Sequence, residues 1–118
     1  MNIKEELKKI IENIEKENYS YKFESLAYSY SDEITDLFKV LDDERIRKIF
    51  DDNCSKYSYD IKKELDQKKE PESYSLIDCV MYFNWIWHLE AGIAVGIVLK
   101  RIKEGKYLRA LKRFYELV

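Results

Sequence analysis

The sequence has few residues that break regular backbone structure. Its 118 residues include only three glycines and one proline. β-Sandwiches and β-barrels need many tight turns, in which these two residues are enriched, so their scarcity argues against both architectures and favours long helices. A chain of this length fits one domain around one core, and we therefore expect a single helical domain over residues 1–118.

Cysteine and histidine are also scarce, which limits the chemistry that the chain can support. Cys54 and Cys79 lack C-x-x-C spacing, and two cysteines are too few for a disulfide framework. The only histidine, His88, has no partner at the i, i+3 or i, i+4 spacing of metal ligands. A glycine-rich phosphate loop, a G-x-S-x-G motif and a Cys–His pair are missing as well. We therefore expect no metal, no cofactor and no enzymatic activity.

Apolar residues recur at three- and four-residue steps along most of the chain, which is the pattern of amphipathic helices. The first stripe consists of Ile3, Leu7, Ile10, Ile11 and Ile14. We expect helices over 2–18, from about 23 to 41 after an extended entry at 19–22, over 43–69 and over 106–117. Breaks at Ser31 and at 51–53 stay open. The N-terminal stretch is charged and has no apolar signal core, so we expect a cytoplasmic protein.

One segment, residues 75–104, is apolar on nearly every side. Residues 79–99 are long enough to span a bilayer and contain a G-x-x-x-G spacing from Gly92 to Gly96. Polar residues interrupt this stretch, and a charge at a membrane centre costs about 2.5–3.5 kcal/mol. We therefore expect no membrane span. The segment is predicted as the central helix of an all-α bundle of four to five helices, with both glycines as close-packing positions.

Three polar side chains in this apolar segment are candidates for chemistry. A buried carboxylate must be paired or protonated, so Asp78 and Glu90 are expected to form a salt bridge or a cap to a basic neighbour. His88 is expected as a hydrogen-bonded residue in the core or at its boundary. The alternative is a small enzyme that uses Glu90 and His88, and it predicts a cavity that holds these groups.

The charge is unevenly distributed along the chain. Residues 100–118 carry a net charge of +5, which leaves −7 for residues 1–99 of a chain with net charge −2. A basic helix can contact phosphates, although cations near a helix C-terminus also suit the helix dipole. An alternative function is therefore nucleic-acid binding by five basic residues of the C-terminal region, namely Lys103, Lys106, Arg109, Lys112 and Arg113.

Tyrosine is the most unusual component, with ten in the chain. Tyrosine offers a large rigid contact area with a polar tip, which suits protein interfaces. The rings of Tyr30, Tyr57, Tyr82 and Tyr107 are expected at the core boundary, whereas Tyr74 and others near loops are expected to be partly exposed. The predicted protein-binding set consists of Tyr19, Tyr21, Tyr28, Asp32, Glu33, Asp51, Asp52 and Tyr59.

Two stretches resemble an uncharacterised bacterial family of small proteins, a domain of unknown function. The first is Tyr30-Ser31-Asp32-Glu33-Ile34, and the second comprises Trp85-Ile86, Glu90, Gly96, Gly105 and Leu111-Lys112-Arg113. The family pattern has arginines around its Glu, where this chain has His88, Leu89 and Ala91. The resemblance implies a compact helical fold and no assigned activity.

These patterns together favour a non-enzymatic protein that binds another protein. A small, tyrosine-rich, acidic helical protein suits an inhibitor, such as a toxin-immunity protein or a phage anti-defence protein that acts on a nuclease. A homo-oligomer stays open, because the apolar segment could have more surface than four short helices cover.

Overall fold

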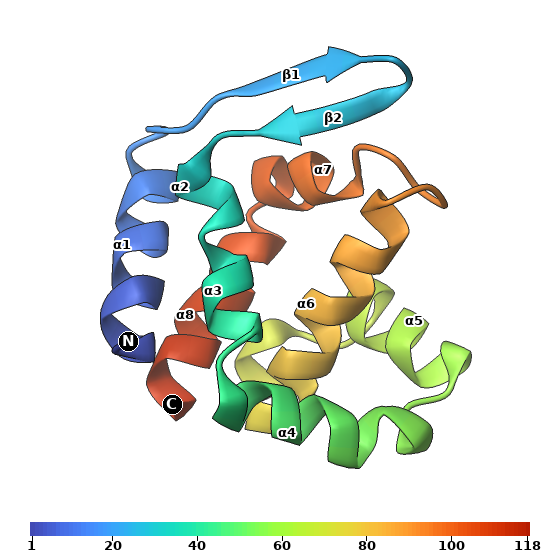
Figure 1. Ribbon diagram of the computed structural model, residues 1–118. Helices are drawn as coiled ribbons and strands as arrows, with labels where there is room; N and C mark the ends of the chain where they lie inside the picture. Colours follow the sequence, from blue (N-terminus) through green and yellow to red (C-terminus); the bar gives the residue numbers. More distant parts are fainter.

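The computed structural model describes all residues from Met1 to Val118 and is mainly helical, which confirms the predicted fold class. Figure 1 shows the helices gathered around α6, with one small hairpin at the edge. The elements in chain order are α1 (Ile3–Glu15), β1 (Tyr21–Glu24), β2 (Ala27–Tyr30), α2 (Asp32–Thr35), α3 (Leu37–Leu41), α4 (Glu44–Asn53), η1 (Cys54–Lys56), α5 (Tyr59–Gln67), η2 (Pro71–Ser73), α6 (Leu76–Glu90), α7 (Ile97–Glu104) and α8 (Lys106–Leu117).

Helix α6 is the centre of the core. Its first turn carries a capping box, in which the Ser75 hydroxyl accepts from the Asp78 N–H and the Asp78 carboxylate accepts from the Ser75 N–H. Along the helix, Tyr82 and Phe83 are fully buried, and the Phe83 ring stacks at 5.9 Å on Phe114 of α8. The apolar face of α1 packs against α8, so the two chain ends lie close together (Figure 1).

The segment predicted as one central helix over 75–104 is two helices. Helix α6 ends at Glu90, a turn covers residues 91–96, and α7 begins at Ile97. Gly96 has φ +92, a left-handed conformation that glycine adopts without a steric penalty, and it occupies the N-cap position directly before α7. The glycines are also not packing positions between helices. A Cβ on Gly92 would meet nothing within 4 Å, and one on Gly96 would meet only the Tyr28 ring.

The helix predicted from about residue 23 is wrong at its start, because residues 21–30 form a β-hairpin. Strands β1 and β2 pair antiparallel, with Tyr21 opposite Tyr30 and Phe23 opposite Tyr28. The apolar residues of this stretch fit both a helical and an alternating spacing, and the alternating one prevails here. The open break at Ser31 is confirmed, since Ser31 precedes α2 with an extended backbone.

The predicted segment 43–69 is divided as well. Helix α4 ends at Asn53, one short turn follows, and α5 begins at Tyr59. Asp43 caps α4 and Ser58 caps α5, each through its side-chain oxygen. Gly105 separates α7 from α8, and its φ of +87 lies in the left-handed region. None of the helices combines the length and the apolar character that crossing a bilayer requires.

Candidate protein-binding surface

Four aromatic rings share one face of the hairpin. Because residues opposite each other in an antiparallel pair point to the same side, Tyr21, Phe23, Tyr28 and Tyr30 lie together. The Tyr28 ring is 4.9 Å from Phe23 and 6.0 Å from Tyr30. The two tyrosines of Tyr28-Ser29-Tyr30 therefore point to the same side, because this triplet is part of strand β2. In the triplet 57–59 the two rings do differ, with Tyr57 half-buried and Tyr59 exposed.

Tyr30 and Glu90 connect the hairpin to the turn between α6 and α7. The Tyr30 hydroxyl donates to the Glu90 carboxylate at 2.9 Å, and the Tyr30 ring meets Trp87 edge-on at 5.5 Å. The same carboxylate accepts from the N–H groups of Gly96 at 2.7 Å and Val98 at 2.9 Å, so it caps α7. Burial, together with the Glu90 carboxylate, raises the pKa of Tyr30.

The sequence predicts that Glu90 forms a salt bridge or a cap with a basic neighbour. The cap is confirmed, but the predicted basic partner is wrong. No basic residue pairs with this carboxylate, since two backbone amides and one hydroxyl satisfy it. A carboxylate at the N-terminal end of a helix is favourable because the free N–H groups and the helix dipole both attract negative charge. Glu90 therefore holds together the hairpin, the turn at 91–96 and α7.

An exposed apolar patch lies at the end of the molecule where the hairpin meets this turn. We define the apical patch as Leu26, Ile93 and Val95, with exposed fractions of 82%, 68% and 40%. The two parts are in contact, because the Tyr28 ring lies against Gly96. Figure 1 shows the hairpin tip and the turn at 91–96 at the same end of the protein.

The hairpin tip combines exposure with an unfavourable backbone. Ser25 and Leu26 form its two-residue turn and have φ values of +51 and +64. Positive φ at both central residues is the requirement of the type I′ turn, for which Asn-Gly is the preferred pair. A residue with a Cβ loses about 1–2 kcal/mol in the left-handed region. Because the Leu26 side chain is exposed, its burial within the chain does not offset this free-energy cost.

The predicted protein-binding set does not form one surface. Five of its members, Tyr19, Tyr21, Tyr28, Asp32 and Glu33, belong to the hairpin region and α2. The other three, Asp51, Asp52 and Tyr59, lie on α4 and α5, at the opposite end of the molecule in Figure 1. Tyr21 and Tyr59 are exposed at 44% and 60%, whereas Tyr74 is fully buried, against the expectation for it.

The five basic residues predicted to contact nucleic acid all have partners within the chain. Four of the five reach a carboxylate or a backbone carbonyl, and the fifth reaches a tyrosine hydroxyl. The partners are Tyr21 for Lys103, the carbonyls of Asp66 and Lys69 for Lys106, Glu70 and Glu72 for Arg109, Glu15 for Lys112, and Glu116 and the Tyr74 carbonyl for Arg113. A phosphate would have to compete with these acceptors, so the geometry gives the nucleic-acid alternative no continuous free basic surface.

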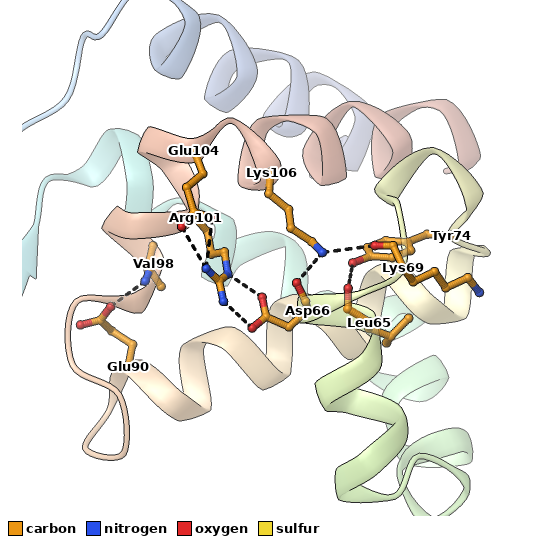
Figure 2. A network of polar contacts seen from close by, with 9 residues as sticks. All are labelled: Leu65, Asp66, Lys69, Tyr74, Glu90, Val98, Arg101, Glu104 and Lys106. Carbon is orange, nitrogen blue, oxygen red and sulfur yellow. Dashed lines mark hydrogen bonds and ion pairs between the residues drawn. The ribbon is translucent and has the colours of Figure 1, made fainter.

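A buried ion pair holds α7 to α5, as Figure 2 shows. The Arg101 guanidinium donates to both carboxylate oxygens of Asp66 at 2.7 and 2.8 Å. The exposed fractions of the two side chains are 11% and 3%, and Glu104 adds an accepting carboxylate at 3.1 Å. The hydrogen bonds to Asp66 raise the pKa of Arg101.

The carbonyls at the end of α5 are also satisfied by side chains (Figure 2). The Tyr74 hydroxyl donates to the Leu65 carbonyl, and the Lys106 ammonium donates to the carbonyls of Asp66 and Lys69. Burial lowers the pKa of Lys106, and the nearby Asp66 opposes this effect. These contacts give Lys106 and Tyr74 a structural role, because the last carbonyls of a helix have no partner within the helix.

Asp78 forms the salt bridge that the sequence predicts. Its carboxylate accepts from Lys69 at 2.9 Å and from the Tyr57 hydroxyl at 2.6 Å. Burial favours the neutral acid, but the hydrogen bonds from Lys69, Tyr57 and Ser75 outweigh it and hold the pKa of Asp78 below its usual value. Burial and the Asp78 carboxylate raise the pKa of Tyr57 to about 12.

His88 lies in a different environment from both carboxylates. It is exposed rather than at the core boundary, and its ring lies 5.9 Å from Trp85. It borders an open cavity of about 320 Å³ whose other lining residues are Phe50, Cys54, Lys62, Met81, Asn84 and Trp85. Neither Glu90 nor Asp78 lines this cavity, so the cavity does not bring together Glu90 and His88, the two residues of the enzyme alternative. No three His, Cys, Asp or Glu side chains are grouped so that they could hold a metal ion.

Comparisons with protein-family models, with curated proteins and with solved structures find no match for this chain. The resemblance to a domain of unknown function therefore stays a prediction.

Sequence reasoning did not identify Leu26, Ile93 or Val95 as surface residues. Leu26 fitted the helical stripe from residue 23, and Ile93 and Val95 fell within the predicted central helix. One signal could have found the turn, because two glycines four residues apart in an apolar segment also mark a chain reversal.

Proposed function

We propose that the chain is a non-enzymatic protein-binding module and that the apical patch is its contact surface. The observation that carries the proposal is Leu26, which is 82% exposed on a left-handed backbone. A large apolar side chain in this position adds nothing to the stability of the isolated chain, but it can enter an apolar recess on another protein. Ile93 and Val95 extend the same contact from the neighbouring turn.

The remaining geometry supports binding more than catalysis. The polar groups that sequence reasoning offered for chemistry, Glu90 and Asp78, are occupied by structural contacts. A module of this kind acts by covering part of its partner, so we propose inhibition as its activity. The specific form expected from the sequence, a toxin-immunity or phage anti-defence protein acting on a nuclease, is a narrower version of the same proposal.

The test uses a change that removes the leucine and improves the turn. Replacing Ser25-Leu26 by Asn-Gly supplies the preferred type I′ pair, so we expect the hairpin to be at least as stable while the apolar tip is lost. Ile93→Asn removes the second part of the patch. Ile61→Asn is the matched control, because Ile61 is 42% exposed on α5 at the other end of the protein.

Tagged forms of all four proteins are purified from the native host, and bound proteins are quantified by mass spectrometry. We expect one partner that binds the wild type and Ile61→Asn and is lost from both patch variants. The melting temperature of the Asn-Gly variant should be equal to or higher than that of the wild type. Capture of the same proteins by all four forms contradicts the proposal. So does co-purification of nucleic acid alone, with binding that falls steeply with salt.

A further inference from the structure

Strand β1 has a free hydrogen-bonding edge. Strand β2 lies between β1 and the helices, and β1 is the outermost element of the molecule in Figure 1. All four residues of β1 are exposed, and the Phe23 ring is exposed at 55%. An unpaired edge of this kind is a template for another strand unless the protein blocks it.

The hairpin register shows which backbone groups point outwards. The Ser31 N–H donates to the Ser20 carbonyl at 2.9 Å, so the pair 20–31 is a hydrogen-bonded pair of the ladder. In an antiparallel pair such positions alternate with non-hydrogen-bonded ones, so Lys22 and Glu24 also direct their backbone groups to β2. The N–H and C=O groups of Tyr21 and Phe23 therefore point away from β2, along the free edge.

A second copy of the same strand fits this edge in one particular register. With Phe23 opposite Phe23 of the second copy, the two residues exchange their outward N–H···O=C bonds across the two-fold axis. On the opposite face, Lys22 of each copy then lies across from Glu24 of the other. Within one copy Lys22 and Glu24 already pair at 2.6 Å, so the four side chains form a square of alternating charge.

The other register uses the outward groups of both Tyr21 and Phe23 and so makes four backbone hydrogen bonds, whereas the register centred on Phe23 makes two. However, this other register places Tyr21 opposite Phe23 of the second copy and therefore sets Lys22 against Lys22. Like charges directly opposite each other are destabilising in an antiparallel pair. Charge complementarity thus favours the register centred on Phe23.

We propose that two copies of this chain associate through their β1 edges, with Phe23 against Phe23 and Lys22 against Glu24, to form a continuous four-stranded sheet. This inference does not depend on the proposed function, because the backbone groups and charges that it uses belong to residues 22–24 and the apical patch consists of Leu26, Ile93 and Val95. The association is weak, since the contact is short and its ion pairs are exposed.

Charge reversal tests the register directly. Lys22→Glu sets two glutamates against each other across the axis in its own dimer, and Glu24→Lys sets two lysines against each other. We expect each single variant to dimerise about tenfold more weakly than the wild type, because two attractive pairs become repulsive. A mixture of the two variants restores the pairing, since one copy then carries only glutamates and the other only lysines. The double variant Lys22→Glu/Glu24→Lys also dimerises like the wild type.

Sedimentation velocity over a concentration series measures these equilibria. Lys48→Glu is the matched control, because Lys48 forms a similar exposed pair with Asp52 at 3.0 Å on α4, away from the hairpin. We expect it to dimerise like the wild type. Wild-type protein that stays monomeric at millimolar concentration overturns the proposal, as does association that neither single variant weakens or that their mixture does not restore. If these tests fail while the partner of the apical patch is still captured, only the self-association is wrong.

Discussion

The two ends of this protein differ in how their polar backbone and side-chain groups find hydrogen-bond and ion-pair partners. Near α5, α7 and α8, the Asp66–Arg101 pair is almost fully buried, and Lys106 and Tyr74 cover the last carbonyls of α5. At the hairpin end, Glu90 is the main polar connection, and Leu26 and Ile93 stay exposed. The first end gains stability from its contacts. The second keeps apolar surface that contributes nothing to the isolated chain, which is the expected property of a contact surface.

The largest effect is expected at the buried end. Asp66→Ala leaves the Arg101 guanidinium buried without its main partner, and removing one member of a buried ion pair costs about 3–5 kcal/mol. Chemical denaturation measures the free energy of unfolding. Asp60→Ala, an exposed change in the first turn of α5, is the control and should cost far less. If both variants lower the free energy of unfolding equally, the buried ion pair contributes no more to stability than an exposed carboxylate.

A smaller loss is expected when the hairpin is released. Glu90→Ala leaves the N–H groups of Gly96 and Val98 and the Tyr30 hydroxyl without their acceptor, at a cost of about 2–3 kcal/mol. Hydrogen exchange should become faster in the hairpin amides and in the first turn of α7 while the amides of α5 and α8 keep their protection. Tyr30→Phe removes only one of these bonds and should cost about 1 kcal/mol. Uniformly faster exchange along the whole chain would contradict a local role for Glu90.

The two glycines of the turn provide a finer comparison within the hairpin end. Gly96→Ala places a Cβ 3.0 Å from the Tyr28 ring on a left-handed backbone, and the backbone term alone costs about 1–2 kcal/mol. Gly92→Ala meets no neighbour and should change the free energy of unfolding by less than about 0.5 kcal/mol. Thermal unfolding of both variants checks the difference, and equal melting temperatures would contradict the left-handed backbone at Gly96.

The smallest effect concerns pH. The pKa of Asp78 is lower in the folded chain than in the unfolded one, so its ionised form stabilises the fold above the unfolded pKa of about 4. This stability is lost as the pH falls through the lower folded pKa. The stability difference between the wild type and Asp78→Asn should therefore shrink on acidification below that pH. If the stability difference stays constant down to the pH of acid unfolding, the contacts with Lys69 and Tyr57 do not favour the ionised form of Asp78.

Much of the helical framework follows from residue patterns, and the hairpin end does not. The stripe of α1 and the division between the segments 75–104 and 106–117 are local features that single-sequence reasoning identifies. Residues 23–30 fit two periodicities, and the strand is chosen because Tyr28 and Tyr30 pack on Gly96 and Trp87 from a distant part of the chain. Contacts of this range carry no signal in the local spacing.

The sequence by itself determined a helical class, an apolar centre around α6 and the need to pair Asp78 and Glu90, because periodicity and the cost of buried charge depend only on residue type and order. The tertiary structure decided which groups do the pairing, where the central segment divides and which apolar side chains remain exposed. These outcomes depend on which elements meet in space, as when the Glu90 carboxylate receives Tyr30 from a strand sixty residues earlier in the chain.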